Sequence, residues 1–277
     1  MTMHTSRYQP TDYAPAQAPR TGQTGLPLVV RVGSDAAGQW LRTGLAVVRA
    51  APALSLLYGA LFALACAAML ALTQTFPWFT LAFLTGLLLI GPFLAAGLYG
   101  AARDHEAGRT VSIRATLGLL WERRTNLSLF AVFLALVMAA WVRFSALLFA
   151  VMDSSLSPTA NSYQALLTGS IDPVLGGFFV LIGGLLALVV FVSSAIAMPM
   201  IVDRDAGPIT AISTSVRAVT ANWRAMAVWA AAIVGLTLIG ILTAFVAMVV
   251  IFPVLGYATW ASYRGLTGTG TAAAAAV

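Results

Sequence analysis

Residues 173–198 read PVLGGFFVLIGGLLALVVFVSSAIAM, and they decide the fold because they hold no charged side chain. Asp172 is the last charged residue before this stretch. About 20 consecutive apolar residues are enough to cross the hydrocarbon core of a bilayer as a helix. Apolar runs of similar length occur at about 52–73, 78–102 and 127–151, the last of which contains one charged residue, Arg143. The sequence therefore predicts an all-α, polytopic transmembrane bundle.

The composition of the whole chain points the same way. Of its 277 residues, 60% are hydrophobic and 9% are charged, and the mean hydropathy is +0.91. An ordinary soluble domain has about 25% charged residues, so this composition excludes a soluble enzyme and a nucleic-acid reader. The one cysteine, Cys66, lies inside an apolar run and excludes an intramolecular disulfide.

The two ends of the chain differ from its middle. Residues 1–25 are rich in Pro, Thr, Gln and Ala without periodicity, and 265–277 are Gly, Thr and Ala. We expect both to be disordered tails around a single transmembrane domain at 26–264. The first tail has no apolar core of signal-peptide length, so the first span is expected to act as its own insertion signal.

A fifth apolar run, 225–263, is nearly twice as long as one span needs. It is either a hairpin of two short helices or one span with an interfacial extension. The distribution of arginine helps here, because all 15 basic residues are arginine. Twelve of them lie in alternate connections: Arg31, Arg42 and Arg49; Arg103, Arg109, Arg114, Arg123 and Arg124; Arg204, Arg217 and Arg224; and finally Arg264.

The opposite connections carry no basic residue. Residues 74–77 are uncharged, and 153–172 contain only Asp153 and Asp172. The positive-inside rule therefore places both termini and both arginine-rich loops in the cytoplasm. Arg264 returns to that side only if 225–263 crosses twice, so we predict six spans.

An internal repeat supports this count. Each cytoplasmic segment reads acid, small residues, glycine and a helix-period stretch, and then enters the membrane; the three stretches are 39–50, 111–124 and 208–221. Each returning span carries a proline, namely Pro92, Pro199 and Pro253. We therefore predict a threefold helix-hairpin repeat.

The three stretches have apolar stripes at helical spacing, which predicts amphipathic helices. Such helices either lie in the headgroup plane or pack on their own spans as connectors, and the two are compatible. Arginine forks bind phosphate, so we expect an anionic phospholipid, cardiolipin or phosphatidylglycerol, to be bound at the cytoplasmic face. The predicted lipid-binding residues are Arg42, Arg49, Arg114, Arg123, Arg124, Arg217, Arg224, Trp40, Trp121 and Trp223.

Groups for catalysis are scarce. The two histidines, His4 and His105, lie outside the spans, so intramembrane haem or copper ligation is not expected. Met198-Pro199-Met200 is far more typical of packing than of a soft-metal site. Asp203-Arg204-Asp205 either binds a cation or relays protons, or it caps a helix or pairs with arginines of neighbouring loops, and its loop position favours structure. We expect no cofactor, no metal and no catalytic residue.

Arg143 is the one ionisable residue in a span-like stretch, which makes it a functional candidate by default. It lies 19 positions after Arg124, which is about 28 Å along a helix. That length nearly crosses the hydrocarbon, so we favour snorkelling to the outer headgroups over a substrate or relay role.

Three segments resemble a bacterial family of uncharacterised integral membrane proteins: Gly91-Pro92-Phe93, the stretch from Asp203-Arg204-Asp205 to Asn222, and 255–264. The resemblance covers about 30–265. Some members are labelled putative cytochrome c oxidase subunits, which implies at most an accessory role beside such a complex. It also implies a bacterial inner-membrane location, and it carries over no catalytic residue.

These observations favour a non-catalytic accessory or scaffold subunit of a larger membrane complex, such as a respiratory complex, with other membrane subunits and lipids as partners and no nucleic acid. The alternative is a small membrane transporter, which needs a polar cavity at the midplane built from broken helices. Pro92, Pro199 and Pro253 can break helices, but the spans offer few polar side chains beside them.

Overall fold

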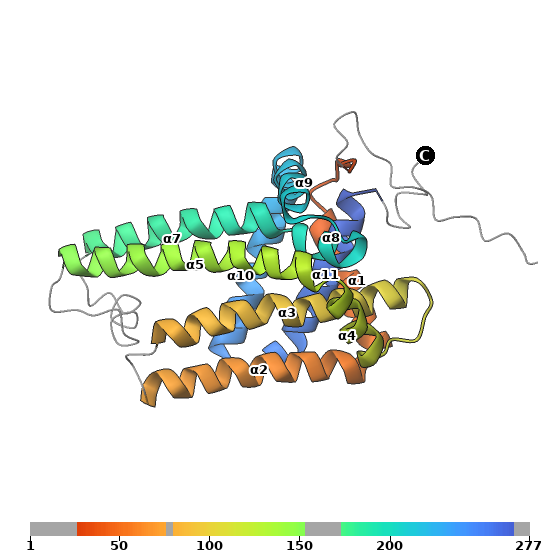
Figure 1. Cartoon of the computed structure of the whole chain (residues 1–277), viewed down its shortest axis with the longest axis horizontal. Coiled ribbons are helices and arrows are strands. Elements are labelled where there is room, and N and C mark those ends of the chain that lie inside the picture. Colours follow the sequence, from red (N-terminus) through yellow and green to blue (C-terminus); the bar gives the residue numbers. More distant parts are fainter. Residues whose placement is uncertain (1–26, 76–79, 153–172, 269–277) are drawn as a thin grey trace, which may run out of the picture.

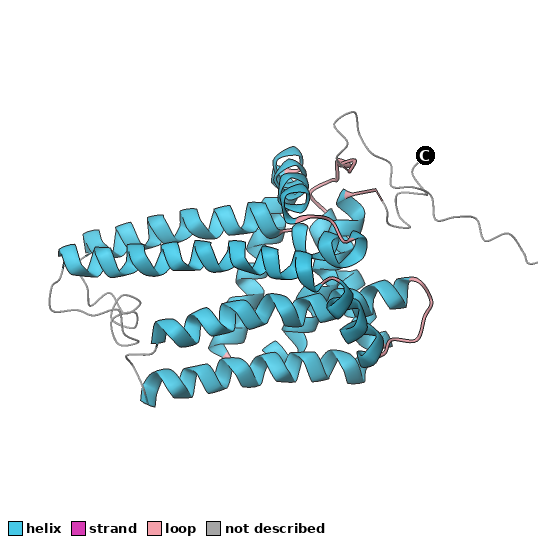
Figure 2. Ribbon diagram, in the orientation of Figure 1, coloured by secondary structure: helices cyan, strands magenta, loops and turns pink. Residues whose placement is uncertain are grey.

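The computed structural model describes residues 27–75, 80–152 and 173–268. This part of the chain is an all-α bundle, as predicted (Figure 2). Its helices are α1 (Ala36–Ala50), α2 (Pro52–Thr75), α3 (Thr80–Glu106), α4 (Ile113–Glu122), α5 (Arg124–Met152), α7 (Pro173–Ser194), α8 (Ala197–Arg204), α9 (Pro208–Ala221), α10 (Trp223–Leu242) and α11 (Met248–Leu266).

The long apolar run near the C-terminus is two helices, α10 and α11. The chain turns between them at Ala244 and Phe245, whose φ angles of 48° and 66° are left-handed. Within the described residues, four segments are long and apolar enough to cross a membrane, 52–73, 124–147, 176–204 and 223–242. The hairpin is thus confirmed as secondary structure, whereas crossings by α3 and α11, and hence six spans, stay predictions.

The ends of the chain differ from expectation in one detail. The predicted tail 1–25 and residues 269–277 lie outside the described residues. Helix α11, however, continues past 264 to Leu266, whose side chain is fully buried. The carbonyl oxygen of Leu266 accepts a hydrogen bond of 2.8 Å from the backbone N–H of Val30. Residues 265 and 266 therefore belong to the folded domain.

The order of elements repeats three times: a short helix, an outgoing long helix and a returning one. The sets are α1, α2, α3; then α4, α5, α7 with α8; then α9, α10, α11. In each set a single residue separates the short helix from the outgoing one, namely Ala51, Arg123 or Asn222. The backbone N–H of each donates back into the short helix, at 3.0 to 3.1 Å. Each junction is therefore a kink and not a loop.

The predicted boundaries of the short helices need correction. The stretch 208–221 agrees with α9, and Pro208 lies in its first turn as expected. The stretch 39–50 begins too late, because α1 starts at Ala36. The stretch 111–124 is too long at both ends, because α4 spans Ile113–Glu122 and the kink at Arg123 falls inside the predicted range.

The three sets pack in a ring. Helix α1 lies on α11, α4 lies on α3, and α9 lies on α7 and α8. Each short helix thus packs on the returning helix of the set before it, and the first packs on the last. The returning helices α3, α8 and α11 also contact one another. Figure 1 shows α1, α4, α8 and α9 together at one end of the long helices.

Glycines allow the closest of these contacts. A Cβ atom at Gly44 of α1 would lie 2.5 Å from the carbonyl oxygen of Val254 in α11. One at Gly59 of α2 would overlap the backbone of Val249 in α11. Small residues allow helices in lipid to approach until their backbones touch. Because Gly44 and Gly59 have no Cβ atom, α1 and α2 can both pack directly against the backbone of α11.

The fourth predicted span, 173–198, is divided into α7 and α8. Between them the hydroxyl of Ser215, from α9, donates to the carbonyl oxygen of Val192 at 2.8 Å and accepts from the N–H of Ile196 at 3.4 Å. Pro199 follows in the first turn of α8, where a missing N–H costs nothing. A serine of another helix therefore bonds two backbone groups at the break, the carbonyl oxygen of Val192 and the N–H of Ile196.

Candidate functional site

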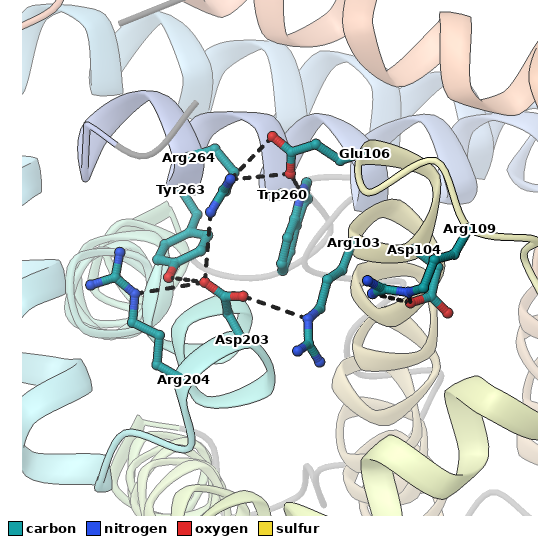
Figure 3. A network of polar contacts seen from close by, with 9 residues as sticks. All are labelled: Arg103, Asp104, Glu106, Arg109, Asp203, Arg204, Trp260, Tyr263 and Arg264. Carbon is teal, nitrogen blue, oxygen red and sulfur yellow. Dashed lines mark hydrogen bonds and ion pairs between the residues drawn. The ribbon is translucent and has the colours of Figure 1, made fainter. Parts of the chain in front are cut away.

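The densest polar cluster joins the ends of the three returning helices (Figure 3). Helix α3 ends in Arg103 and Glu106, and α8 ends in Asp203 and Arg204. The last turns of α11 carry Trp260, Tyr263 and Arg264. Because these helices contact one another, their charged last turns meet at the same end of the bundle as the short helices.

Asp203 lies at the centre of this cluster. Its carboxylate is 3.8 Å from Nε of Arg103, 3.6 Å from Nε of Arg204 and 3.9 Å from Nη1 of Arg264. The hydroxyl of Tyr263 donates a hydrogen bond of 2.7 Å to it. The side chain of Asp203 is only 15% exposed. One carboxylate therefore neutralises cations from all three returning helices.

Glu106 makes the second connection between α3 and α11. Nε of Arg264 lies 3.1 Å from one of its carboxylate oxygens, and the indole Nε1–H of Trp260 donates to the same oxygen at 3.1 Å. Arg264 therefore lies between two carboxylates, Glu106 and Asp203. This chain of ion pairs couples the end of α11 to both other returning helices.

Asp205 extends the charged motif toward α5. Its backbone is left-handed, with φ at 54°, and its carboxylate is 3.1 Å from Nη1 of Arg123. The amide of Asn126 donates to the side chain of Asp205 at 2.9 Å and to its carbonyl oxygen at 3.1 Å. The hydrogen bond from Asn126, helped by Arg123, holds the pKa of Asp205 below its usual value. Asp203-Arg204-Asp205 therefore pairs with arginines of neighbouring segments, as its structural interpretation predicted.

The cluster borders a shallow depression of about 200 Å³. Arg103, Asp203 and Arg264 line it together with Glu106, Arg109 and Trp260. Arg109 is itself bound by Asp104 at 2.6 Å. Among the described residues, no group of three His, Cys, Asp or Glu side chains is arranged to hold a metal ion. Met198 and Met200 are buried in the core, at 6% and 2% exposure, which agrees with packing.

Comparison with known proteins bears on the segment that holds two of these three helix ends. Residues 79–203 match the family model described as "Predicted integral membrane protein (DUF2189)". This match confirms the resemblance to uncharacterised integral membrane proteins and the membrane location. No curated protein and no solved structure matches the chain. The DUF2189 segment includes Arg103, Glu106 and Asp203 and stops before α11, which supplies Tyr263 and Arg264.

The structure separates the residues predicted to bind lipid. Within the DUF2189 segment, Arg114 is exposed, Arg123 pairs with Asp205, and Arg124 stacks on the exposed ring of Trp121 at 4.9 Å. Outside it, Arg42 and Arg49 are exposed on α1, Arg217 is half-buried, and Arg224 stacks on the exposed Trp223 at 5.2 Å. Trp40 is 6% exposed and packs edge-on against Trp229 in the core, so it lies inside the protein.

The sequence pattern alone assigns no role to Glu106, Trp260 or Tyr263. The signal for Glu106 was its place in the repeated acid, small residue and glycine pattern, which lies at or before the start of each short helix. Trp260 and Tyr263 had no such signal. Their role depends on the contact of α11 with α3 and α8. Arg143 lies on α5 with an exposed side chain, and its snorkelling stays a prediction.

Proposed function

We propose that this protein is a non-catalytic subunit of a larger membrane complex, such as a respiratory complex, in an accessory or scaffold role. The observation that carries the proposal is the use of its carboxylates. Asp203, Glu106 and Asp205 each bind arginines of the same chain, and these pairs tie helix ends together. Carboxylates that are paired in this way support a structural role, because they are not available to bind a substrate.

The α5 and α7 hairpin is the surface that we assign to a transmembrane helix of a partner subunit. Only 11% of the apolar segment of α5 is buried in the bundle, against 28% for α2. On α7, a Cβ atom at Gly177 or Gly184 would meet nothing within 4 Å. These glycines are seven residues apart and so lie on one helix face. Small residues on an open face permit close packing of a second helix.

We expect the protein to co-migrate with a stoichiometric partner when it is purified in mild detergent. Gly177→Leu with Gly184→Leu should remove most of that partner, because two isobutyl groups would hold the second helix away. Gly235→Leu on α10 is the matched control, since its Cβ position is also open. Partner loss that is equal in both variants, or a lone protein that moves solute across liposomes, would contradict the proposal.

The transporter alternative is favoured by one feature, the break between α7 and α8. Discontinuous helices often hold substrates with their free backbone groups. Here Ser215 occupies the carbonyl oxygen of Val192 and the N–H of Ile196. Such an arrangement supports a structural break, and the flux measurement above decides between the two functions.

We further propose a bacterial inner-membrane location with both termini in the cytoplasm. The support is that α1, α4, α8 and α9 lie together at one end of the bundle (Figure 1) and that the arginine-bearing last turns of α3, α8 and α11 contact one another, together with the positive-inside rule. We propose that lipid headgroups contact this same end of the bundle. Exposed arginines of that end, such as Arg42, Arg49, Arg124 and Arg224, are placed to meet anionic headgroups.

The orientation is tested with single cysteines in a Cys66→Ser background. Ala115→Cys, on the exposed side of α4, should react with an impermeant maleimide only after the cells are permeabilised, when the reagent reaches the cytoplasmic side of the membrane. Ala160→Cys lies outside the described residues and is expected to react in intact cells. The reverse pattern of labelling would refute the proposed orientation.

A further inference from the structure

A second depression lies where the N-terminal segment crosses the kink between α9 and α10. Its volume is about 280 Å³, and its lining includes Arg31, Val32, Asn222, Trp223 and Arg224. Two of these residues are exposed arginines from parts of the chain that are far apart in sequence. The depression is therefore made by the tertiary structure and not by one helix.

The wall of this depression is fixed by Asn222, whose side chain is buried. Its amide nitrogen donates to the carbonyl oxygens of Val30 and Ala218, both at 3.0 Å. Its amide oxygen accepts from the backbone N–H of Val32 at 2.8 Å. These bonds hold the residues on both sides of Arg31 against the start of α10. The backbone that carries both arginines is thus positioned before any ligand arrives.

The two arginines have no acidic partner within the described chain. The ion pairs that the structure describes engage Arg103, Arg109, Arg123, Arg204 and Arg264, and they include neither Arg31 nor Arg224. Arg224 instead stacks on Trp223, a residue that is 62% exposed. A pair of free guanidinium groups beside an exposed indole matches a phosphate at the boundary of water and hydrocarbon.

We propose that this depression binds the phosphate of an anionic phospholipid, with Arg31 and Arg224 as the phosphate ligands and Trp223 at the glycerol level. The acyl chains lie along α10, which begins at the site and exposes Val228, Val234 and Leu238. This apolar track distinguishes a lipid from a free phosphate, because a soluble anion would use only the arginines. The inference rests on the proposed lipid contact at this end of the bundle and assigns it one specific site.

The test uses the full chain in detergent and measures retained phosphatidylglycerol by native mass spectrometry. Arg31→Gln with Arg224→Gln should lower retention at least about tenfold, since each basic residue at an anionic surface contributes a several-fold factor. Arg42→Gln with Arg49→Gln is the matched control. It removes the same charge from two exposed residues of α1 that take part only in the general headgroup contact, so we expect a several-fold loss that is clearly smaller than the loss in the site variant.

Each outcome decides a separate point. Equal loss in both double variants would overturn the site and retain the general lipid contact, and no loss in either would overturn both. Competition by millimolar inorganic phosphate or glycerol phosphate would overturn the lipid assignment in favour of a soluble anion. If the arginine variant does not fold, Trp223→Ala replaces it, with Trp121→Ala as control. A similar loss from both tryptophan variants would also overturn the site.

Discussion

Asp203→Ala is expected to lower the free energy of unfolding by about 3 kcal/mol, because it removes one partner of a mostly buried ion-pair network. Arg103, Arg204 and Arg264 would then face one another without the carboxylate that lies within 3.6 to 3.9 Å of each. The hydroxyl of Tyr263 would lose its acceptor as well. Reversible unfolding of the detergent-solubilised protein in increasing sodium dodecyl sulfate measures the change.

Asp104→Asn is the matched control for this prediction. It also removes a carboxylate bound to an arginine, but Arg109 is five residues away on the same segment and its side chain is 53% exposed. Exposed pairs of this kind contribute about 1 kcal/mol or less. A loss of similar size in both variants would show that Asp203 does not hold the returning helices together.

Gly59→Val is expected to have an effect of similar size, about 3 kcal/mol, or to prevent accumulation of the folded protein. A Cβ atom at this position overlaps the backbone of Val249, and a backbone cannot move aside as a flexible side chain can. Helices α2 and α11 must therefore separate, and the packing between them is lost. The same detergent unfolding, together with the yield of monodisperse protein, measures the result.

Gly235→Val provides the comparison, since a Cβ atom there meets no atom within 4 Å. Valine and glycine have similar helix propensities within about 0.5 kcal/mol, so this variant should resemble the original protein. If Gly59→Val were equally well tolerated, the close contact of α2 with α11 would be wrong.

The all-α fold and the positions of the long helices were readable from sequence because both depend on local properties. The length of an apolar run can be read directly from the sequence. The backbone hydrogen bonds of such a run form within its own helix and need no distant partner. The repeated short, outgoing and returning order was visible for the same reason. Local pattern did not reveal the break between α7 and α8, because Ser215 of another helix stabilises it.

The ring of packed sets and the charged cluster depended on contacts between distant segments. Asp203 could be recognised as a residue that would pair with arginines, but its actual partners on α3 and α11 follow from helices that are far apart in sequence and touch only in the folded bundle. The depression at Arg31 and Arg224 has the same origin, since Asn222 holds the N-terminal segment across the kink.

Two tryptophans show where local pattern stops being sufficient. Trp40 and Trp121 both lie on apolar stripes of short amphipathic helices, and the sequence predicted the same lipid contact for both. Trp40 is 6% exposed and packs on Trp229, whereas Trp121 is 70% exposed and carries Arg124 on its ring. An apolar stripe at helical spacing determines that one face of the helix is buried away from water. Whether that medium is lipid or protein is decided by which helices lie next to it.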